Sequence, residues 1–308
     1  MGMSTPLNEI ARLCRITPPD VAVELNVLPV HIEHLGTIEN IAKAKAELVE
    51  GMKTGGTAVL NADDHRVAAM APLSKGSVVT YGIREKADIS ASDLVFEGFG
   101  NTRFKLNTPT GTAEVAFPLN GTHNVLNALA AAASGHVFGM EAGDIANALS
   151  CVSAPPQRGE ILRFAGGFTL INDSYNSNPD ALLSMVDTLI EGSPSGSRTI
   201  VVAGEMLELG DNGSEIHRET GIAIASRRVD VLIGVRGLAA DLVFGARSAG
   251  LAEAKFADDS DAAGEMLLSI VEAGDVVLIK GSRGVRTEKV IEKLNEKFEL
   301  EDARTATR

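Results

Sequence analysis

The stretch FTLINDSYNSNPDALLSMV, residues 168–186, decides the fold of the second half of the chain. It opens with apolar residues typical of a buried strand and closes with apolar residues at helical spacing. Between these parts, a run of Asp, Asn and Ser ends at Pro179, a residue type favoured in the first turn of a helix. The stretch therefore predicts a strand followed by a helix, with polar residues at the carboxyl end of the strand, where α/β sheets bind ligands.

The same alternation continues on both sides of this stretch, which predicts an α/β fold with mostly parallel sheets and right-handed crossovers. Residues 88–119 differ, because three short β-type runs separated by turn residues predict antiparallel strands. The other expected strands cover residues 21–27, 57–63, 77–82, 168–176, 198–206, 229–235, 255–259 and 275–282. The expected helices cover residues 38–52, 123–138, 142–152, 180–191, 214–227, 237–249, 260–272 and 286–298.

The segment SAPPQRGE, residues 153–160, is the best candidate for a linker, because two adjacent prolines follow a helix. We place the domain boundary there, with a first domain over residues 1–156 and a second domain over residues 157–308. A length of 308 residues agrees with two domains of ordinary size.

Composition and charge limit the classes of protein and of binding partner that the sequence allows. Hydrophobic residues make up 44% and charged residues 22% of the chain, as in ordinary globular proteins, which excludes wholesale disorder. A formal net charge of −13 disfavours nucleic acid and anionic membrane surfaces as partners. With two cysteines, no spaced Cys/His cluster, no long apolar run and no signal peptide, the sequence predicts a cytoplasmic protein without membrane insertion.

The first domain contains two candidate metal or catalytic residues. His31 follows a predicted strand, and its imidazole could ligate a metal, although an exposed loop is the simpler interpretation. Lys45 lies on an Ala-rich predicted helix. It either belongs to a solvated charged face or points into a site, where burial would leave its amine reactive.

A third candidate group lies at the start of the helix expected over residues 123–138. His123, Asn124 and Asn127 could hydrogen-bond a planar ligand from one face of this helix. Capping of the helix by Thr122, with polar residues in its first turn, is the alternative interpretation.

Polar residues around the strand of the opening stretch form a fourth group. Asp173 is well placed for ribose hydroxyls and Tyr175 for stacking on a base, whereas local Asx-turn chemistry would also explain Asn178. Arg158 either forms an ion pair with Glu160 in the linker or contacts a phosphate.

The last candidate group follows the strand expected over residues 275–282. Lys280, Ser282 and Arg283 lie in a glycine-containing turn before a helix, where anions bind well. Glu205 follows another strand in the same way. No Walker A motif, G-x-x-x-x-G-K-[ST], occurs in the sequence. These residues alone indicate a phosphate-binding or nucleotide-binding cleft.

Taken in order, the motifs resemble those of the Mur ligase family of peptidoglycan synthesis, from residue 1 to about residue 298. The motifs DSYNSNPDAL and GEMLELGD resemble most the branch of the family that adds D-alanyl-D-alanine. Any one motif is weak, and the specificity comes from their order and spacing. The motifs are NVLPVHIEHLG, IAKAKAEL, TAVLNADD, GTHNVLNALAAAA, PPQRGE, INDSYNSNPDAL, GEMLELGD and KGSRGVRTEKV.

The resemblance implies an ATP-dependent amide ligase that uses Mg²⁺ and joins D-alanyl-D-alanine to UDP-N-acetylmuramoyl-tripeptide through an acyl phosphate. It implies that His31 binds a magnesium ion and that Lys45 is carbamylated and becomes an oxygen ligand. In the same way, it implies that adenine is bound by His123, Asn124 and Asn127, and that Arg158 contacts phosphate or ribose. It further implies that Asp173 binds the ribose hydroxyls and that Tyr175 and Asn178 line the nucleotide side of the cleft. The other substrates would be bound by Lys280, Ser282 and Arg283.

The chain also departs from the family pattern. The resemblance implies an incomplete central ATPase-type domain and a Rossmann-like C-terminal domain, without the UDP-binding domain and the Gly-Lys-Thr loop. We expect this polypeptide alone to be nearly inactive, because losing transition-state donors costs about 10²–10³ in rate apiece. Two alternatives stay open: a non-catalytic module that binds a ligand or pairs with a separately encoded N-terminal half, and a ligase for another amino acid.

Overall fold

The computed structural model describes residues 7–28 and 35–301 of the chain. It divides into two compact units, Met1–Glu97 with Asn101–Val152, and Ser153–Arg308 with Gly98–Gly100. None of the helices in the described ranges is both long and apolar enough to cross a membrane.

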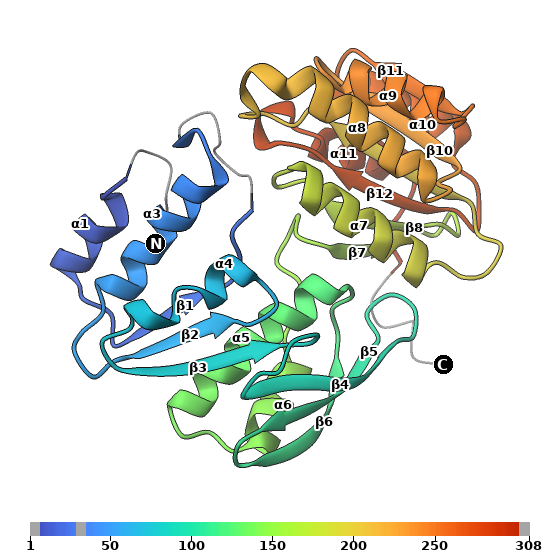
Figure 1. The fold of residues 1–308 in the computed structure, drawn as a ribbon. Helices are drawn as coiled ribbons and strands as arrows, with labels where there is room; N and C mark the ends of the chain where they lie inside the picture. The colour runs from blue at the N-terminus through green and yellow to red at the C-terminus, as the bar shows by residue number, and fades with distance from the viewer. Residues whose placement is uncertain (1–6, 29–34, 302–308) are drawn as a thin grey trace. The chain divides into compact units, whose positions relative to one another are not determined.

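A six-stranded sheet forms the frame of the first unit (Figure 1). Neighbouring strands from β1 to β4 are parallel, whereas β4, β5 and β6 pair antiparallel, as the sequence predicts for residues 88–119. The strands follow chain order across the sheet: β1 (Val21–Glu24), β2 (Thr57–Asn61), β3 (Ser77–Gly82), β4 (Ile89–Phe96), β5 (Thr102–Thr108) and β6 (Gly111–Phe117).

Helices cover both faces of this sheet, because successive side chains of a strand point to opposite faces. Ala22 of β1 packs with Ile41 of α3 (Ile38–Glu50), whereas Val21 and Val23 pack with α5 (Thr122–Val137) and α6 (Ala142–Ser150). Glu24, two residues beyond Ala22, therefore lies on the α3 face. Shorter elements complete the unit: α1 (Glu9–Ile16), α4 (His65–Ala68) and the 3₁₀ helix η1 (Ala71–Leu73).

The second unit is a doubly wound α/β sheet in the order β11-β10-β9-β12-β8-β7 (Figure 1). All its neighbouring strands are parallel except β7 and β8. The strands are β7 (Glu160–Arg163), β8 (Thr169–Asp173), β9 (Thr199–Gly204), β10 (Val231–Val235), β11 (Ala254–Ala257) and β12 (Val276–Lys280).

Both faces of the central strands are buried, as in parallel sheets generally. Leu278 of β12 packs on one face with α7 (Pro179–Gly192), α8 (Gly213–Ser226) and α9 (Ala239–Ser248). Its neighbours Val277 and Ile279 pack on the other face with α10 (Ser260–Ile270) and α11 (Glu288–Lys297). Two 3₁₀ helices, η2 (Gly210–Asn212) and η3 (Arg283–Val285), follow β9 and β12.

The α/β fold class predicted from the sequence is confirmed, with one strand that the sequence analysis missed. β7 pairs antiparallel with β8 and begins at Glu160, inside the segment expected to be a linker. It has only four residues and lies at the edge of the sheet, so it has neither the length nor the apolar character of a central strand.

Candidate functional site

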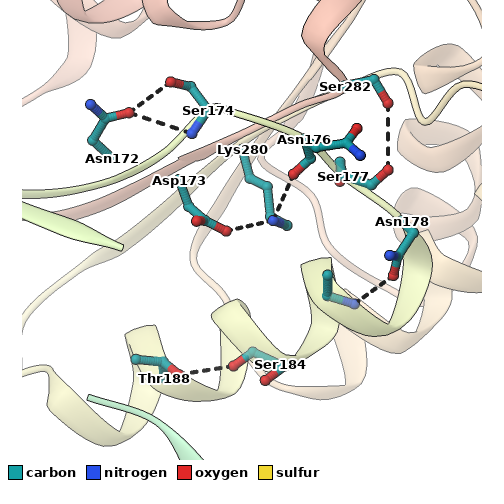
Figure 2. A network of polar contacts seen from close by, with 11 residues as sticks. Asn172, Asp173, Ser174, Asn176, Ser177, Asn178, Ser184, Thr188, Lys280 and Ser282 are labelled. Carbon is teal, nitrogen blue, oxygen red and sulfur yellow. Dashed lines mark hydrogen bonds and ion pairs between the residues drawn. The ribbon is translucent and has the colours of Figure 1, made fainter. Parts of the chain in front are cut away.

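The polar centre of the second unit is an ion pair between Asp173 and Lys280. The two residues end β8 and β12 and are register partners across these parallel strands. Lys280 Nζ lies 2.5 Å from Asp173 Oδ2 and donates to the Asn176 carbonyl oxygen at 2.8 Å (Figure 2). The side chains are only 5% and 15% exposed, so water screens this pair weakly.

Hydrogen bonds of several polar residues stabilise the turn after β8 (Figure 2). The Asn172 side-chain oxygen accepts from Ser174 Oγ at 2.7 Å, and the Tyr175 amide donates to the Gln157 carbonyl oxygen at 3.2 Å. The side-chain oxygen of Asn178 accepts from the Ala181 amide at 2.9 Å and caps α7, in which Pro179 occupies the first turn. The Asx chemistry that the sequence allowed at Asn178 is therefore present.

Ser282 follows β12 and forms hydrogen bonds with the segments that follow β8 and β9. Its hydroxyl accepts from the Leu207 amide at 3.0 Å and lies 3.4 Å from the Ser177 carbonyl oxygen, to which it donates. Its own amide donates to the Glu205 carbonyl oxygen at 3.4 Å. A hydroxyl has one donor and two acceptor positions, so Ser282 Oγ keeps one lone pair for a further donor. Among the described residues, the buried Ser177 Oγ beside it has no hydrogen-bond partner.

Two exposed arginines, Arg158 and Arg283, lie near the turn after β8. The Arg158 guanidinium lies 4.0 Å from the centroid of the Tyr175 ring, a cation–π arrangement. Arg283 donates to the Gln157 side-chain oxygen at 3.1 Å. The expected pairing of Arg158 with Glu160 is replaced by other contacts, since Glu160 accepts from the side chain of Asn172 at 2.9 Å. Gln157 was not among the candidates, because nothing in its local sequence marks it.

In the first unit, the three candidate residues of α5 lie in its first two turns. The Asn124 side-chain amide nitrogen donates to the Asn120 carbonyl oxygen at 2.7 Å, which leaves its side-chain oxygen as an acceptor for a ligand. His123 is half-buried and Asn127 is exposed. The capping role considered for Thr122 is wrong, because the N-cap is Gly121 with a φ of +92°, a conformation that favours glycine.

Lys45 extends from α3 toward a buried carboxylate that the sequence analysis did not single out. Its Nζ lies 3.9 Å from Glu24 Oε2, and the Glu24 side chain is 6% exposed. Burial raises the pKa of Glu24 to about 7, and the Lys45 cation opposes this rise. A charged residue within the predicted strand VAVELNV was the signal that could have revealed it.

The metal ligands expected in this unit are only partly described. His31 lies outside the described residues. Within those that are described, no group of three or more His, Cys, Asp and Glu side chains is placed to hold a metal ion. Of the two expected ligands, only Lys45 lies in the described ranges, and it faces the Glu24 carboxylate.

Comparison with known proteins identifies relatives of both units. The sequence profile of the Mur ligase middle domain matches residues 1–135, and that of the Mur ligase glutamate ligase domain matches residues 157–283. UDP-N-acetylmuramoyl-tripeptide–D-alanyl-D-alanine ligase of Bacillus subtilis is 31% identical over 96% of this chain and 63% of its own length. The ligase of the same name from Escherichia coli is 32% identical over 94% of this chain and 63% of its own length.

Solved structures give the same result. MurF from Acinetobacter baumannii has a TM-score of 0.87 and 26% identity, covering 96% of this chain and 64% of its own. MurF ligase from Thermotoga maritima in complex with ADP has a TM-score of 0.84 and 26% identity, covering 96% and 66%. The chain thus spans a little under two thirds of the length of the first relatives it matches. With matching middle and C-terminal domains and these relatives, the chain belongs to the Mur ligase family.

Proposed function

We propose that this chain forms the nucleotide-binding and dipeptide-binding parts of a cytoplasmic ATP-dependent amide ligase. The enzyme would add D-alanyl-D-alanine to UDP-N-acetylmuramoyl-tripeptide. The observation that carries the proposal is the polar edge at the carboxyl ends of β8 and β12, built on the Asp173–Lys280 pair. The names of the Bacillus subtilis and Escherichia coli relatives support the choice of substrates.

The proposed reaction has two steps. The tripeptide carboxylate takes the γ-phosphoryl group of ATP, which gives an acyl phosphate and releases ADP. The amine of D-alanyl-D-alanine then attacks the acyl carbon, forms the amide bond, and releases inorganic phosphate and a proton. In phosphoryl transfer of this kind, the protein acts mainly by positioning and by charge neutralisation.

Both units, each taken by itself, contain side chains suited to a nucleotide. We assign the side-chain oxygen of Asn124 to the exocyclic amine of adenine, because the side-chain nitrogen of Asn124 already donates to Asn120. His123 and Asn127, in the same two helical turns, would flank the base. In the second unit, Lys280 occupies Asp173 Oδ2, so Asp173 Oδ1 is the oxygen assigned to a ribose hydroxyl.

The cations of the second unit suit the anionic substrates. Arg158, stacked on Tyr175, presents a guanidinium suited to phosphate, and Arg283 beside Gln157 presents another. Ser282 would accept from the incoming dipeptide through its remaining lone pair. Lys280 would serve by holding Asp173 and the turn at Asn176, since its amine is already engaged by both.

In the first unit, Glu24 and Lys45 are the described residues that would help to hold a hard divalent cation. Mg²⁺ prefers oxygen ligands, and Glu24 places a carboxylate oxygen 3.9 Å from Lys45 Nζ. A carbamylated Lys45 would add a second oxygen donor there, and His31 is the further ligand that the family resemblance implies. When bound, Mg²⁺ would neutralise the charge that develops on the transferred phosphoryl group.

The test is substrate-dependent phosphate release. The tested protein is a fusion in which residues 1–308 follow the part of the Bacillus subtilis relative that the chain does not cover. The assay contains ATP, Mg²⁺ and UDP-N-acetylmuramoyl-tripeptide. Release only when D-alanyl-D-alanine is present, with mass-spectrometric detection of the pentapeptide product, is the expected result. A non-catalytic module predicts no release, and a ligase for another amino acid predicts release with glutamate or another amine instead.

A further inference from the structure

His217 of α8 is fully buried, and both nitrogens of its ring are engaged. Nε2 lies 2.9 Å from the Met206 amide nitrogen, and Nδ1 lies 2.6 Å from the Gly213 carbonyl oxygen. The ring itself is 0% exposed. None of the sequence motifs assigned a role to this residue.

These two contacts fix the tautomer of His217. An amide N–H can only donate, so Nε2 must be the acceptor and carries no proton. A carbonyl oxygen can only accept, so the proton sits on Nδ1. Burial lowers the pKa of His217, although the Gly213 hydrogen bond and the charges of Glu205 and Asp241 oppose this effect, and the neutral ring agrees with the geometry.

The contact with Met206 leads directly to Ser282. Leu207 is the next residue in the chain, and its amide donates to Ser282 Oγ at 3.0 Å. The Ser282 amide in turn donates to the Glu205 carbonyl oxygen at 3.4 Å. His217 therefore holds the centre of a three-residue segment, 205–207, that touches Ser282 at both of its ends.

We propose that His217 is a positioning residue that sets where the Ser282 hydroxyl lies, and thereby tunes binding of the amine-bearing dipeptide. The dipeptide part of this inference rests on the proposed function. The role in holding Ser282 rests only on the contacts of His217, Met206, Leu207 and Ser282.

Three single variants separate this role from general destabilisation. His217→Leu fills the space but removes the acceptor, whereas His217→Gln keeps an oxygen that can accept from the Met206 amide. Thr220→Val is the matched control on the same helix, because Thr220 is also buried but its hydroxyl bonds only within α8, to Ile216.

Amide hydrogen exchange and ligand titrations on the 308-residue chain give the readouts. In His217→Leu we expect exchange at Met206 and Leu207 to be about tenfold faster and D-alanyl-D-alanine affinity about tenfold lower. ADP affinity should stay within about twofold, whereas a merely structural role would lower both affinities. His217→Gln should restore the dipeptide affinity, and Thr220→Val should leave it unchanged.

A double-variant cycle tests more directly whether His217 acts through Ser282. If His217 acts through Ser282, the exchange rate of Leu207 in His217→Leu/Ser282→Ala should not exceed the faster single variant. Independent additive effects, or unchanged Leu207 exchange in His217→Leu, would overturn the proposal. If wild-type chain shows no dipeptide-dependent shift at Ser282, the proposed function fails, while the exchange cycle still decides the positioning role.

The wild-type chain supplies a measurement that does not depend on a folded variant. Nitrogen NMR of the ring should find Nδ1 protonated, with a coupling across the hydrogen bond between the Met206 amide and Nε2. A proton on Nε2 would overturn the proposal.

Discussion

Replacing Lys280 by Met tests whether the Asp173–Lys280 pair organises the edge of the second unit. The variant leaves a carboxylate that is 15% exposed without its partner and frees the Asn176 carbonyl oxygen. Breaking a buried ion pair from one side costs about 3–5 kcal/mol of unfolding free energy, of which a lost neutral hydrogen bond would explain only about 1. We therefore expect Lys280→Met to destabilise the second unit by about 4 kcal/mol.

Urea unfolding followed by hydrogen exchange of β12 measures this change. Asp173→Asn in the Lys280→Met background should recover much of the loss, because no charge is then left without a partner. Lys289→Met is the matched control, since Lys289 pairs with Asp261 at 2.6 Å in the same unit but the two side chains are 31% and 51% exposed. We expect no resolvable change there. Equal effects at Lys280 and Lys289, or additive effects in the double variant, would refute the reasoning.

Three further predictions concern the nucleotide side and pH. Asn124→Ala should lower ATP affinity by about two- to tenfold but leave inosine triphosphate affinity unchanged, because that base lacks the exocyclic amine; equal losses in calorimetry would contradict the assignment. Tyr175→Leu should weaken ADP binding by about two- to fivefold through loss of the Arg158 stacking, whereas Tyr175→Phe should not; the same titration decides. Because burial raises the pKa of Glu24 from 4.5 to about 7, the folded state binds the extra proton. Proton binding by Glu24 therefore stabilises the folded state fully below pH 4.5. As the pH rises from 4.5 to 7, the free energy of unfolding falls by about 3 kcal/mol at most. Glu24→Gln should remove this slope from urea midpoints measured across that range, and an unchanged slope would show that Glu24 is not the group responsible.

Local sequence was sufficient for most elements and for the places where the candidate residues lie. Alternating apolar runs and turn residues located the strands of both sheets except β7, and they located the carboxyl ends of β8 and β12 to within three residues. Asp173 and Lys280 were both identified there. Their pairing could not be predicted, because it depends on the register of two strands more than a hundred residues apart in the chain.

What sequence reasoning missed depends on burial and on contacts between distant segments. Glu24 was overlooked because the sequence does not show whether a carboxylate in a strand faces the interior or the solvent. His217 has an unremarkable helical context, and its role arises from Met206, eleven residues earlier. The N-cap of α5 moved from Thr122 to Gly121, since a left-handed φ cannot be read from residue type alone.

The most direct test of the central claim compares amines in the joined enzyme that carries residues 1–308. Phosphate release is measured with ATP, Mg²⁺ and UDP-N-acetylmuramoyl-tripeptide while the second substrate is D-alanyl-D-alanine, L-alanyl-L-alanine or D-glutamate. The account predicts release and a pentapeptide product with D-alanyl-D-alanine alone, and loss of both in Ser282→Ala. Release with D-glutamate in preference to the dipeptide, or a rate that does not depend on any amine, would contradict it.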